Sequence, residues 1–69
     1  MKFRVLGTAP SREQIVRLVN EYYCSRHYIM GEETSENHYK IVNELTYRHT
    51  NTCIRYYRKR WQFGSYEEV

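Results

Sequence analysis

The sequence predicts a single α+β domain of two layers, in which one amphipathic helix packs on a small antiparallel sheet in the order β-α-β-β-β. Three patterns predict this fold: an apolar–polar alternation at the amino end, a helical apolar period over residues 11–24, and a later region rich in β-branched and aromatic residues. A chain of 69 residues has room for one small domain, so residues 1–69 are assigned to it.

The amino end fits a strand over residues 2–9. Phe3 and Val5 alternate with Lys2 and Arg4. A period of two predicts a strand with one buried face. We therefore expect Phe3 and Val5 to face the core.

The helix is predicted at about residues 11–24. Ser11 and Gln14 have the spacing of a capping box, in which a hydroxyl and a side-chain amide satisfy unpaired backbone N–H groups of the first turn. Polar residues, Asn20 among them, fall mostly on the other side of the helix from the apolar stripe. The stripe repeats at i, i+3, i+4, i+7 and i+8 and comprises Ile15, Leu18, Val19, Tyr22 and Tyr23.

Residues 35–49 fit either a sheet or a helix. In the sheet interpretation, residues 26–31 form a strand, 32–37 a polar turn, and 38–45 a second strand. The density of Tyr, Ile, Val and Thr in this half of the chain favours the sheet. One face of the second strand would hold Tyr39, Ile41 and Leu45.

In the helix interpretation, Thr34 or Ser35 caps a helix that reaches His49. Opposite charges four residues apart stabilise a helix, and they recur through this segment. This pattern keeps the helix open as an alternative. The charge ladder comprises Glu36, Lys40, Glu44 and Arg48.

Residues 53–63 are rich in β-branched and aromatic types and predict a strand. A break near residues 58–60 would turn this strand into a hairpin whose return runs to Tyr66.

The segment 55–63 carries the densest chemistry, with four cations and four aromatic rings in nine residues. Cations neutralise phosphates and rings stack on unpaired bases, so the segment predicts contact with single-stranded or structured RNA or DNA. An unbroken strand would place Arg55, Tyr57 and Trp61 on one face. The alternative is an edge strand whose cations prevent aggregation and whose rings belong to the core. The candidate binding residues are Arg55, Tyr56, Tyr57, Arg58, Lys59, Arg60 and Trp61.

A protein partner is the second hypothesis. Eight tyrosines cannot all be buried in so small a body, and exposed Tyr beside Arg is typical of protein–protein hot spots. The chain would then be a small regulator or inhibitor, of the type that phages and mobile elements encode, acting on a host protein or ribonucleoprotein complex. It would use the same segment together with the acidic residues 32–36.

Two Cys/His pairs have the spacing of metal ligands, Cys24-x-x-His27 and His49-x-x-x-Cys53. Thiolate and imidazole suit tetrahedral zinc. The ordered Cys-x-x-Cys spacing of common zinc fingers is absent, and no local pattern brings the two pairs together. We therefore expect no cofactor, with zinc at these four residues as the weaker alternative.

Composition argues against several other classes. All eight acids are Glu, which leaves no Asp for a catalytic triad, and so short a chain has little volume to enclose a substrate pocket. No apolar run approaches the roughly 20 residues of a membrane span, and the amino end lacks a signal-peptide core. We therefore expect a cytoplasmic, non-enzymatic protein with no membrane partner. Because the aliphatic core is small, a homodimer would allow the chain to bury more surface.

Overall fold

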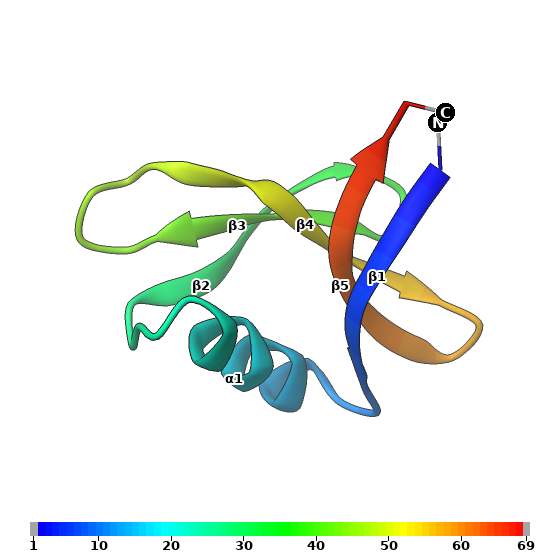
Figure 1. Ribbon diagram of the computed structural model, residues 1–69, viewed down its shortest axis with the longest axis horizontal. Coiled ribbons are helices and arrows are strands. Elements are labelled where there is room, and N and C mark those ends of the chain that lie inside the picture. Colours follow the sequence, from blue (N-terminus) through cyan, green and yellow to red (C-terminus); the bar gives the residue numbers. More distant parts are fainter. Residues whose placement is uncertain (1, 69) are drawn as a thin grey trace.

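The computed structural model describes residues 2–68, which form a five-stranded antiparallel sheet and one helix. The sheet has the strand order β1-β5-β4-β3-β2, and α1 lies against one face of it (Figure 1). The α+β class is therefore confirmed, with one strand more than the order β-α-β-β-β. The elements are β1 (Lys2–Ala9), α1 (Arg12–Tyr22), β2 (Tyr28–Ser35), β3 (His38–Asn43), β4 (His49–Tyr57) and β5 (Arg60–Glu67).

The connection through α1 joins the two edges of the sheet. β1 and β2 flank α1 in the sequence, yet they lie at opposite edges, with the other strands between them. Lys2 pairs with Glu67, so the start of β1 and the end of β5 lie side by side. Figure 1 shows that the sheet twists strongly, because β1 and β5 cross the direction of β2, β3 and β4 steeply.

Helix α1 confirms the prediction for residues 11–24. The Ser11 hydroxyl oxygen accepts a hydrogen bond from the Gln14 N–H at 3.2 Å. The Gln14 side chain does not reach back to a backbone N–H. Its Oε1 instead accepts from the Ser11 hydroxyl at 3.0 Å. The chain leaves the helix through Cys24, whose φ of 52° lies in the left-handed region.

Asn20 anchors α1 to the edge strand β2. Its Oδ1 accepts from the Tyr28 N–H at 2.9 Å, and its Nδ2 donates to the Tyr28 carbonyl, also at 2.9 Å. The same Nδ2 lies 3.1 Å from the Val16 carbonyl. The side chain therefore pairs with a backbone unit as a neighbouring strand would, so Asn20 is a structural residue although its place in the helical pattern is polar.

The core lies between α1 and the sheet. Residues of the helix stripe meet the centres of β3, β4 and β5, and half-buried rings surround them. At Gly7 a Cβ would lie 2.4 Å from Leu18, so a glycine allows α1 to approach β1 closely. The buried hydrophobic residues are Ala9, Ile15, Val19, Ile41, Ile54 and Phe63.

The expectation that Phe3 and Val5 face the core is wrong. The register of β1 against β5 shifts between Val5 and Gly7, and such a bulge changes which residues point to each face. Phe3 and Val5 lie on the face away from α1, where Val5 is 44% exposed, and Leu6 packs against the core instead.

Residues 35–49 adopt the sheet form, so the helix alternative is wrong. β2 continues to Ser35, which shortens the predicted turn over 32–37, and Asn37 has a φ of 59° that no helix allows. The Asn37 N–H donates to the Glu33 carboxylate at 3.1 Å. Tyr39 and Ile41 share the helix side of β3 as predicted, but Leu45 lies beyond the strand and is 64% exposed.

The predicted hairpin after residue 57 is confirmed. Tyr57 pairs with Arg60, which leaves Arg58 and Lys59 as a two-residue turn. Both residues have positive φ, 51° and 64°, as type I′ turns require. Asn-Gly is the usual sequence of a type I′ turn, so the Arg-Lys pair did not indicate the type of this turn or its register.

Candidate nucleic-acid interface

Strand pairing assigns side chains to the two faces of the sheet, because residues directly opposite each other share a face. Phe63, Ile54 and Tyr39 form one row across β5, β4 and β3, on the side of α1. The adjacent row runs across the opposite face, which the helix does not cover and which we call the open face. That row comprises Thr8, Gln62, Arg55 and His38.

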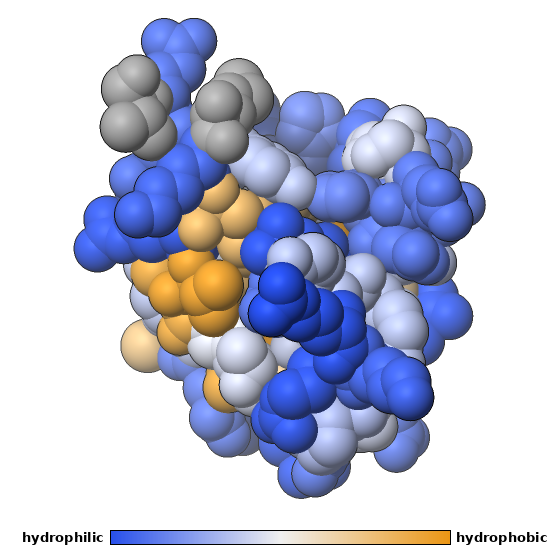
Figure 2. Space-filling view, turned by 90° about the vertical axis from the view of Figure 1, so that its right-hand side faces the viewer, coloured by the Kyte–Doolittle hydropathy of each residue, from blue (hydrophilic) through white to orange (hydrophobic). Residues whose placement is uncertain are grey.

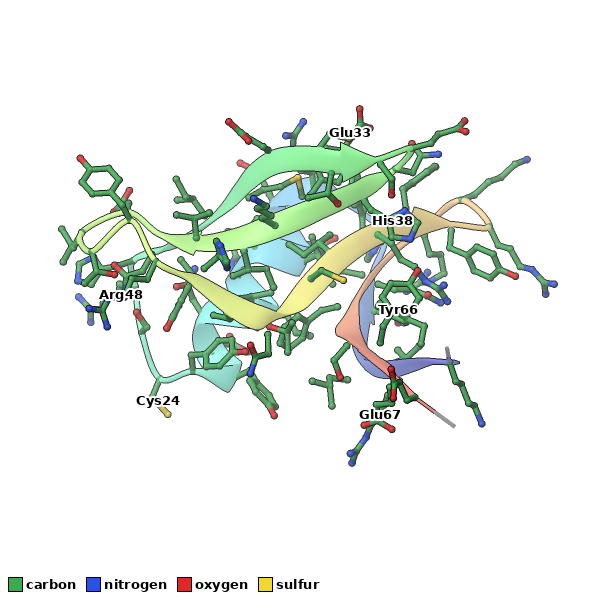
Figure 3. The ribbon with its side chains drawn as sticks, turned by 90° about the horizontal axis from the view of Figure 1, so that it is seen from above. Cys24, Glu33, His38, Arg48, Tyr66 and Glu67 are labelled. Carbon is green, nitrogen blue, oxygen red and sulfur yellow. The ribbon has the colours of Figure 1, made fainter. Side chains whose placement is uncertain are left out.

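Figure 3 looks onto the open face, with α1 behind the sheet. His38 of β3 and Tyr66 of β5 extend toward each other on it. Side chains from four strands meet in this region through hydrogen bonds and ring contacts. We call the group the open-face cluster, and it comprises Phe3, His38, Arg55, Tyr57, Gln62 and Tyr66.

The Arg55 guanidinium lies at the centre of the open-face cluster. Its Cζ is 3.9 Å from the centroid of the Phe3 ring and 4.4 Å from that of the Tyr57 ring. Its Nε donates to the Gln62 Oε1 at 2.7 Å. The contacts with both rings and the hydrogen bond fix the orientation of this half-buried cation.

The Phe3 ring covers Gly64 of β5. A Cβ at Gly64 would lie 2.9 Å from the Phe3 ring and 2.0 Å from the Arg4 carbonyl oxygen. Gly64 is accordingly buried although it lies on the open face. The absence of a side chain at Gly64 therefore leaves room for the Phe3 ring in the place where Arg55 contacts it.

Tyr66 extends the open-face cluster along β5. Its ring meets Phe3 edge to face, with centroids 4.9 Å apart, and its hydroxyl lies 2.5 Å from the His38 Nε2. The His38 Nδ1 lies 2.7 Å from the Glu36 carbonyl oxygen, which can only accept. In neutral His38 the proton is therefore on Nδ1, and Nε2 accepts from the Tyr66 hydroxyl. Tyr57 and Tyr66 remain 43% and 40% exposed, so both offer accessible ring surface.

The residues predicted from segment 55–63 divide between two faces and a turn. Arg55, Tyr57 and Arg60 belong to the open face by register, and Arg58 and Lys59 form the turn. We call Arg58, Lys59 and Arg60 the basic turn. The Arg58 Cζ lies 5.2 Å from the Tyr57 ring centroid, so the basic turn adjoins the open-face cluster.

Tyr56 and Trp61 lie on the other face. They pair with each other across β4 and β5, with ring centroids 4.9 Å apart, and Trp61 packs against the core. The expectation that Trp61 shares a face with Arg55 and Tyr57 is therefore wrong. The two-residue turn reverses the chain and opposes Tyr57 to Arg60, which shifts the alternation by one residue.

Phe3, His38, Gln62 and Tyr66 were not among the predicted site residues. Gln62 lies inside the 55–63 segment, and the other three reach the cluster from β1, β3 and the end of β5, far apart in the sequence. The sequence around Phe3 indicated only an alternating strand, and this alternation predicted the wrong face for Phe3. Long-range strand pairing brings these residues together, and no local pattern encodes it.

Positive charge gathers at the basic turn. Figure 2, which views the molecule from the side of this turn, shows strongly hydrophilic residues beside an apolar area. Within residues 2–68, Arg4 forms an ion pair with Glu67 at 3.4 Å, and the His27 ring, which carries charge only when protonated, lies 3.7 Å from the Glu44 carboxylate. The cations of the basic turn are thus exposed and make no ion pair among these residues.

The four candidate zinc ligands are not brought together. Cys24 is exposed in the loop after α1, where His27 faces Glu44, whereas Cys53 lies on the open face of β4 and His49 at its start. Among the described residues no group of three His, Cys, Asp or Glu side chains could hold a metal ion. Burial raises the pKa of the Cys53 thiol, and the Arg55 charge offsets part of this effect.

Comparisons with known proteins found no matching family model, no matching curated protein and no matching solved structure. Across residues 2–68 no pocket is present, and no helix has the length and apolar character to cross a membrane.

Proposed function

We propose that this chain is a non-enzymatic binding module that holds single-stranded nucleic acid on the open face of its sheet. One observation carries the proposal: the exposed ring of Tyr57 lies 4.4 Å from the Arg55 guanidinium, and the exposed ring of Tyr66 joins the same cluster through Phe3. The adjoining basic turn carries cations that make no ion pair within residues 2–68. Rings and cations on neighbouring positions are what sheet-face readers of single strands combine.

The roles follow from exposure and position. Tyr57 and Tyr66 offer ring surface on which unpaired bases stack. The basic turn neutralises phosphates. Arg55, oriented by Phe3 and Gln62, directs its remaining N–H donors toward a phosphate or a base edge. Tyr56 and Trp61 lie on the other face, so the proposal gives them no contact with the ligand.

A single strand fits this surface better than a duplex. Bases in a duplex stack on one another and cannot also cover a tyrosine ring, whereas unpaired bases can. The open face carries its cations mainly at one end, at the basic turn. A short strand could place phosphates there while its bases reach Tyr57 and Tyr66.

Binding is tested by fluorescence anisotropy with labelled single-stranded RNA, single-stranded DNA and a duplex, at about 50 and 200 mM salt. The test variant is Arg58→Asn/Lys59→Gly, which removes two charges yet supplies the preferred residues of a type I′ turn. The matched control, Arg12→Gln/Arg17→Gln, removes two charges from α1.

We expect single strands to bind more tightly than the duplex. The turn variant should lose about tenfold or more in affinity, and its salt dependence should fall by about 1.4 in the slope of log K against log salt. The control should change little. Absence of binding at about 10 μM protein in the lower salt, or equal losses in both variants, would contradict the proposal.

A further inference from the structure

A second exposed surface lies at the β3–β4 turn, which we call the tip loop and define as Glu44–Arg48. It protrudes at the opposite end of the sheet from the basic turn (Figure 1). Tyr47 is 84% exposed and Leu45 is 64% exposed, the two highest values among the large hydrophobic residues exposed in the described part of the chain. A large ring and an aliphatic side chain of the same short loop thus both extend into solvent.

Hydrogen bonds hold the tip loop rigid. The Asn43 Oδ1 accepts from the N–H groups of Leu45 at 2.9 Å and Thr46 at 3.3 Å, and the Asn43 carbonyl accepts from Tyr47 at 2.8 Å. The Asn43 N–H donates to the Arg48 carbonyl at 2.8 Å. Binding therefore loses little conformational entropy in this loop, since its backbone is already ordered.

The tip loop is also tied to the rest of the molecule. The Glu44 N–H donates to the His27 carbonyl at 2.8 Å, which fixes the loop against the segment between α1 and β2. Leu45 and Tyr47 are consequently presented by a rigid support rather than by a free hairpin.

Tyr47 occupies a backbone conformation that disfavours it. Its φ of 59° lies in the left-handed region, where Gly or Asn is more stable than an aromatic residue. The ring makes no compensating packing, because most of it is exposed. A bulky exposed residue in a strained position is typical of a site selected for contact.

The charges beside the tip loop indicate what kind of surface it meets. Arg48 belongs to the tip loop, and Arg26 directly precedes His27, whose carbonyl accepts a hydrogen bond from Glu44. Both arginines are exposed and form no ion pair among residues 2–68, whereas the Glu44 carboxylate lies 3.7 Å from the His27 ring. The border of the apolar pair is therefore mainly cationic and complements carboxylates.

We propose that the tip loop inserts Leu45 and Tyr47 into an apolar pocket of a folded partner protein, bordered by carboxylates that meet Arg48 and Arg26. Tyr and Arg are the residues that contribute most to such contacts. The proposal is independent of nucleic-acid binding, because it uses the opposite end of the sheet.

The test variant is Leu45→Ser/Tyr47→Asn. Asn suits the left-handed backbone at position 47, and both side chains are exposed, so this variant should fold with an unchanged circular dichroism spectrum. The control is Arg58→Asn/Lys59→Gly, which alters the basic turn and leaves the tip loop intact.

Each purified protein, with a photo-crosslinking group at exposed position 46 of the tip loop, is incubated with a nuclease-treated lysate of the organism that carries the sequence. Captured proteins are identified by mass spectrometry, purified, and titrated against the chain by calorimetry. We expect one protein to bind wild type and the control alike, and to lose about 100-fold or more in affinity for the tip-loop variant. Crosslinks from position 46 should map to an apolar pocket with Asp or Glu at its border.

The proposal is overturned if no captured protein binds directly, if the tip-loop variant binds as well as wild type, or if the crosslinked surface lacks carboxylates. Sedimentation of the isolated chain tests whether a second copy of this chain, rather than a foreign protein, binds the tip loop. A dimer that the tip-loop substitutions dissociate would assign the loop to a second copy of this chain and overturn a foreign partner. Because nuclease removes nucleic acid from the lysate, capture of a partner protein does not depend on nucleic-acid binding. Partner binding and nucleic-acid binding can therefore fail separately, and each remains measurable without the other.

Discussion

Two exposed turns of the sheet, the tip loop and the basic turn, share a backbone feature and differ in the side chains they carry. Tyr47 in one, and Arg58 and Lys59 in the other, adopt positive φ, where Gly or Asn is usually found. The tip loop presents an apolar pair and the basic turn a row of cations. The turn at one end of this small sheet thus presents apolar side chains, and the turn at the other end presents cationic ones.

Because both turns hold non-glycine residues in the left-handed region, we infer that they keep their contact residues at a cost in stability. A non-glycine residue in the left-handed region loses on the order of 1 kcal/mol. Substitutions that relax each turn should therefore stabilise the chain while they weaken binding. Gly64 and Asn20 each support one end of the sheet, and a substitution at either should disturb mainly that end. The largest loss of stability is expected at Gly64.

Gly64→Ala should disrupt the end that carries the open-face cluster. The new Cβ would lie 2.0 Å from the Arg4 carbonyl oxygen, and backbone cannot yield as a flexible side chain can. We expect a loss of about 3 kcal/mol in the free energy of unfolding, with β1 displaced from β5. Urea denaturation measures the loss. Unchanged stability would show that Phe3 and β1 are not held against Gly64 as described.

Asn20→Ala should weaken the other end. It leaves the N–H and carbonyl of Tyr28 without their side-chain partner, in a half-buried place. We expect a loss of about 2 kcal/mol in the free energy of unfolding. Hydrogen exchange should accelerate near β2 and the tip loop more than at the basic turn. A uniform acceleration would show that the two ends do not respond separately.

Arg58→Asn/Lys59→Gly should raise stability. Both residues relax into the conformation that a type I′ turn prefers, for a gain of about 1–2 kcal/mol in the free energy of unfolding. Thermal melts at high salt, where charge repulsion is screened, isolate the backbone effect. A lower melting temperature would mean that the basic side chains stabilise the turn.

Tyr47→Asn should give a smaller gain at the tip loop. One strained residue is relieved and little packing is lost, so we expect about 1 kcal/mol, or a rise of roughly 4 °C in melting temperature. The control is Tyr22→Asn in α1. Tyr22 does not have a positive φ, so this substitution should not stabilise the chain. If Tyr47→Asn destabilises the chain, the ring supports the free protein and is not simply held out for contact.

The smallest effect is expected at the two cysteines. Burial raises the pKa of Cys53, so the folded state holds the thiol proton more firmly than the unfolded state does. The resulting stability is present below the unfolded pKa and is lost as pH rises through the folded pKa. Wild type should therefore lose stability relative to Cys53→Ser above about pH 8.5.

A thiol reagent at about pH 8 should modify exposed Cys24 before Cys53. The reverse order would contradict the half-buried environment described for Cys53.

Local patterns predicted most of the elements but not every face. The helix, its Ser11 cap and the hairpin after Tyr57 follow from spacing and residue type along a few positions. The bulge between Val5 and Gly7 and the Arg58–Lys59 turn each shift the alternation by one residue, and the turn lacks the Gly or Asn that would mark its type. Phe3 and Trp61 were therefore assigned to the wrong sides of the sheet.

The candidate site was predictable only in part, for the same reason. Arg55, Tyr57 and the basic turn stood in one segment, and their composition drew attention to them. Phe3, His38 and Tyr66 join them through pairing between strands that are distant in the sequence. Such contacts depend on strand order, which a single sequence does not specify.

Chemical-shift mapping by NMR tests the central claim most directly. An isotope-labelled chain is titrated with a short single-stranded RNA of about eight nucleotides, within the usual span of such sites. We predict that the largest shifts fall on Phe3, Arg55, Tyr57 and Tyr66 and on the basic turn, while the indole of Trp61 and the residues of α1 change little. Shifts centred on Trp61 and α1, or no shifts at all, would contradict nucleic-acid binding on the open face.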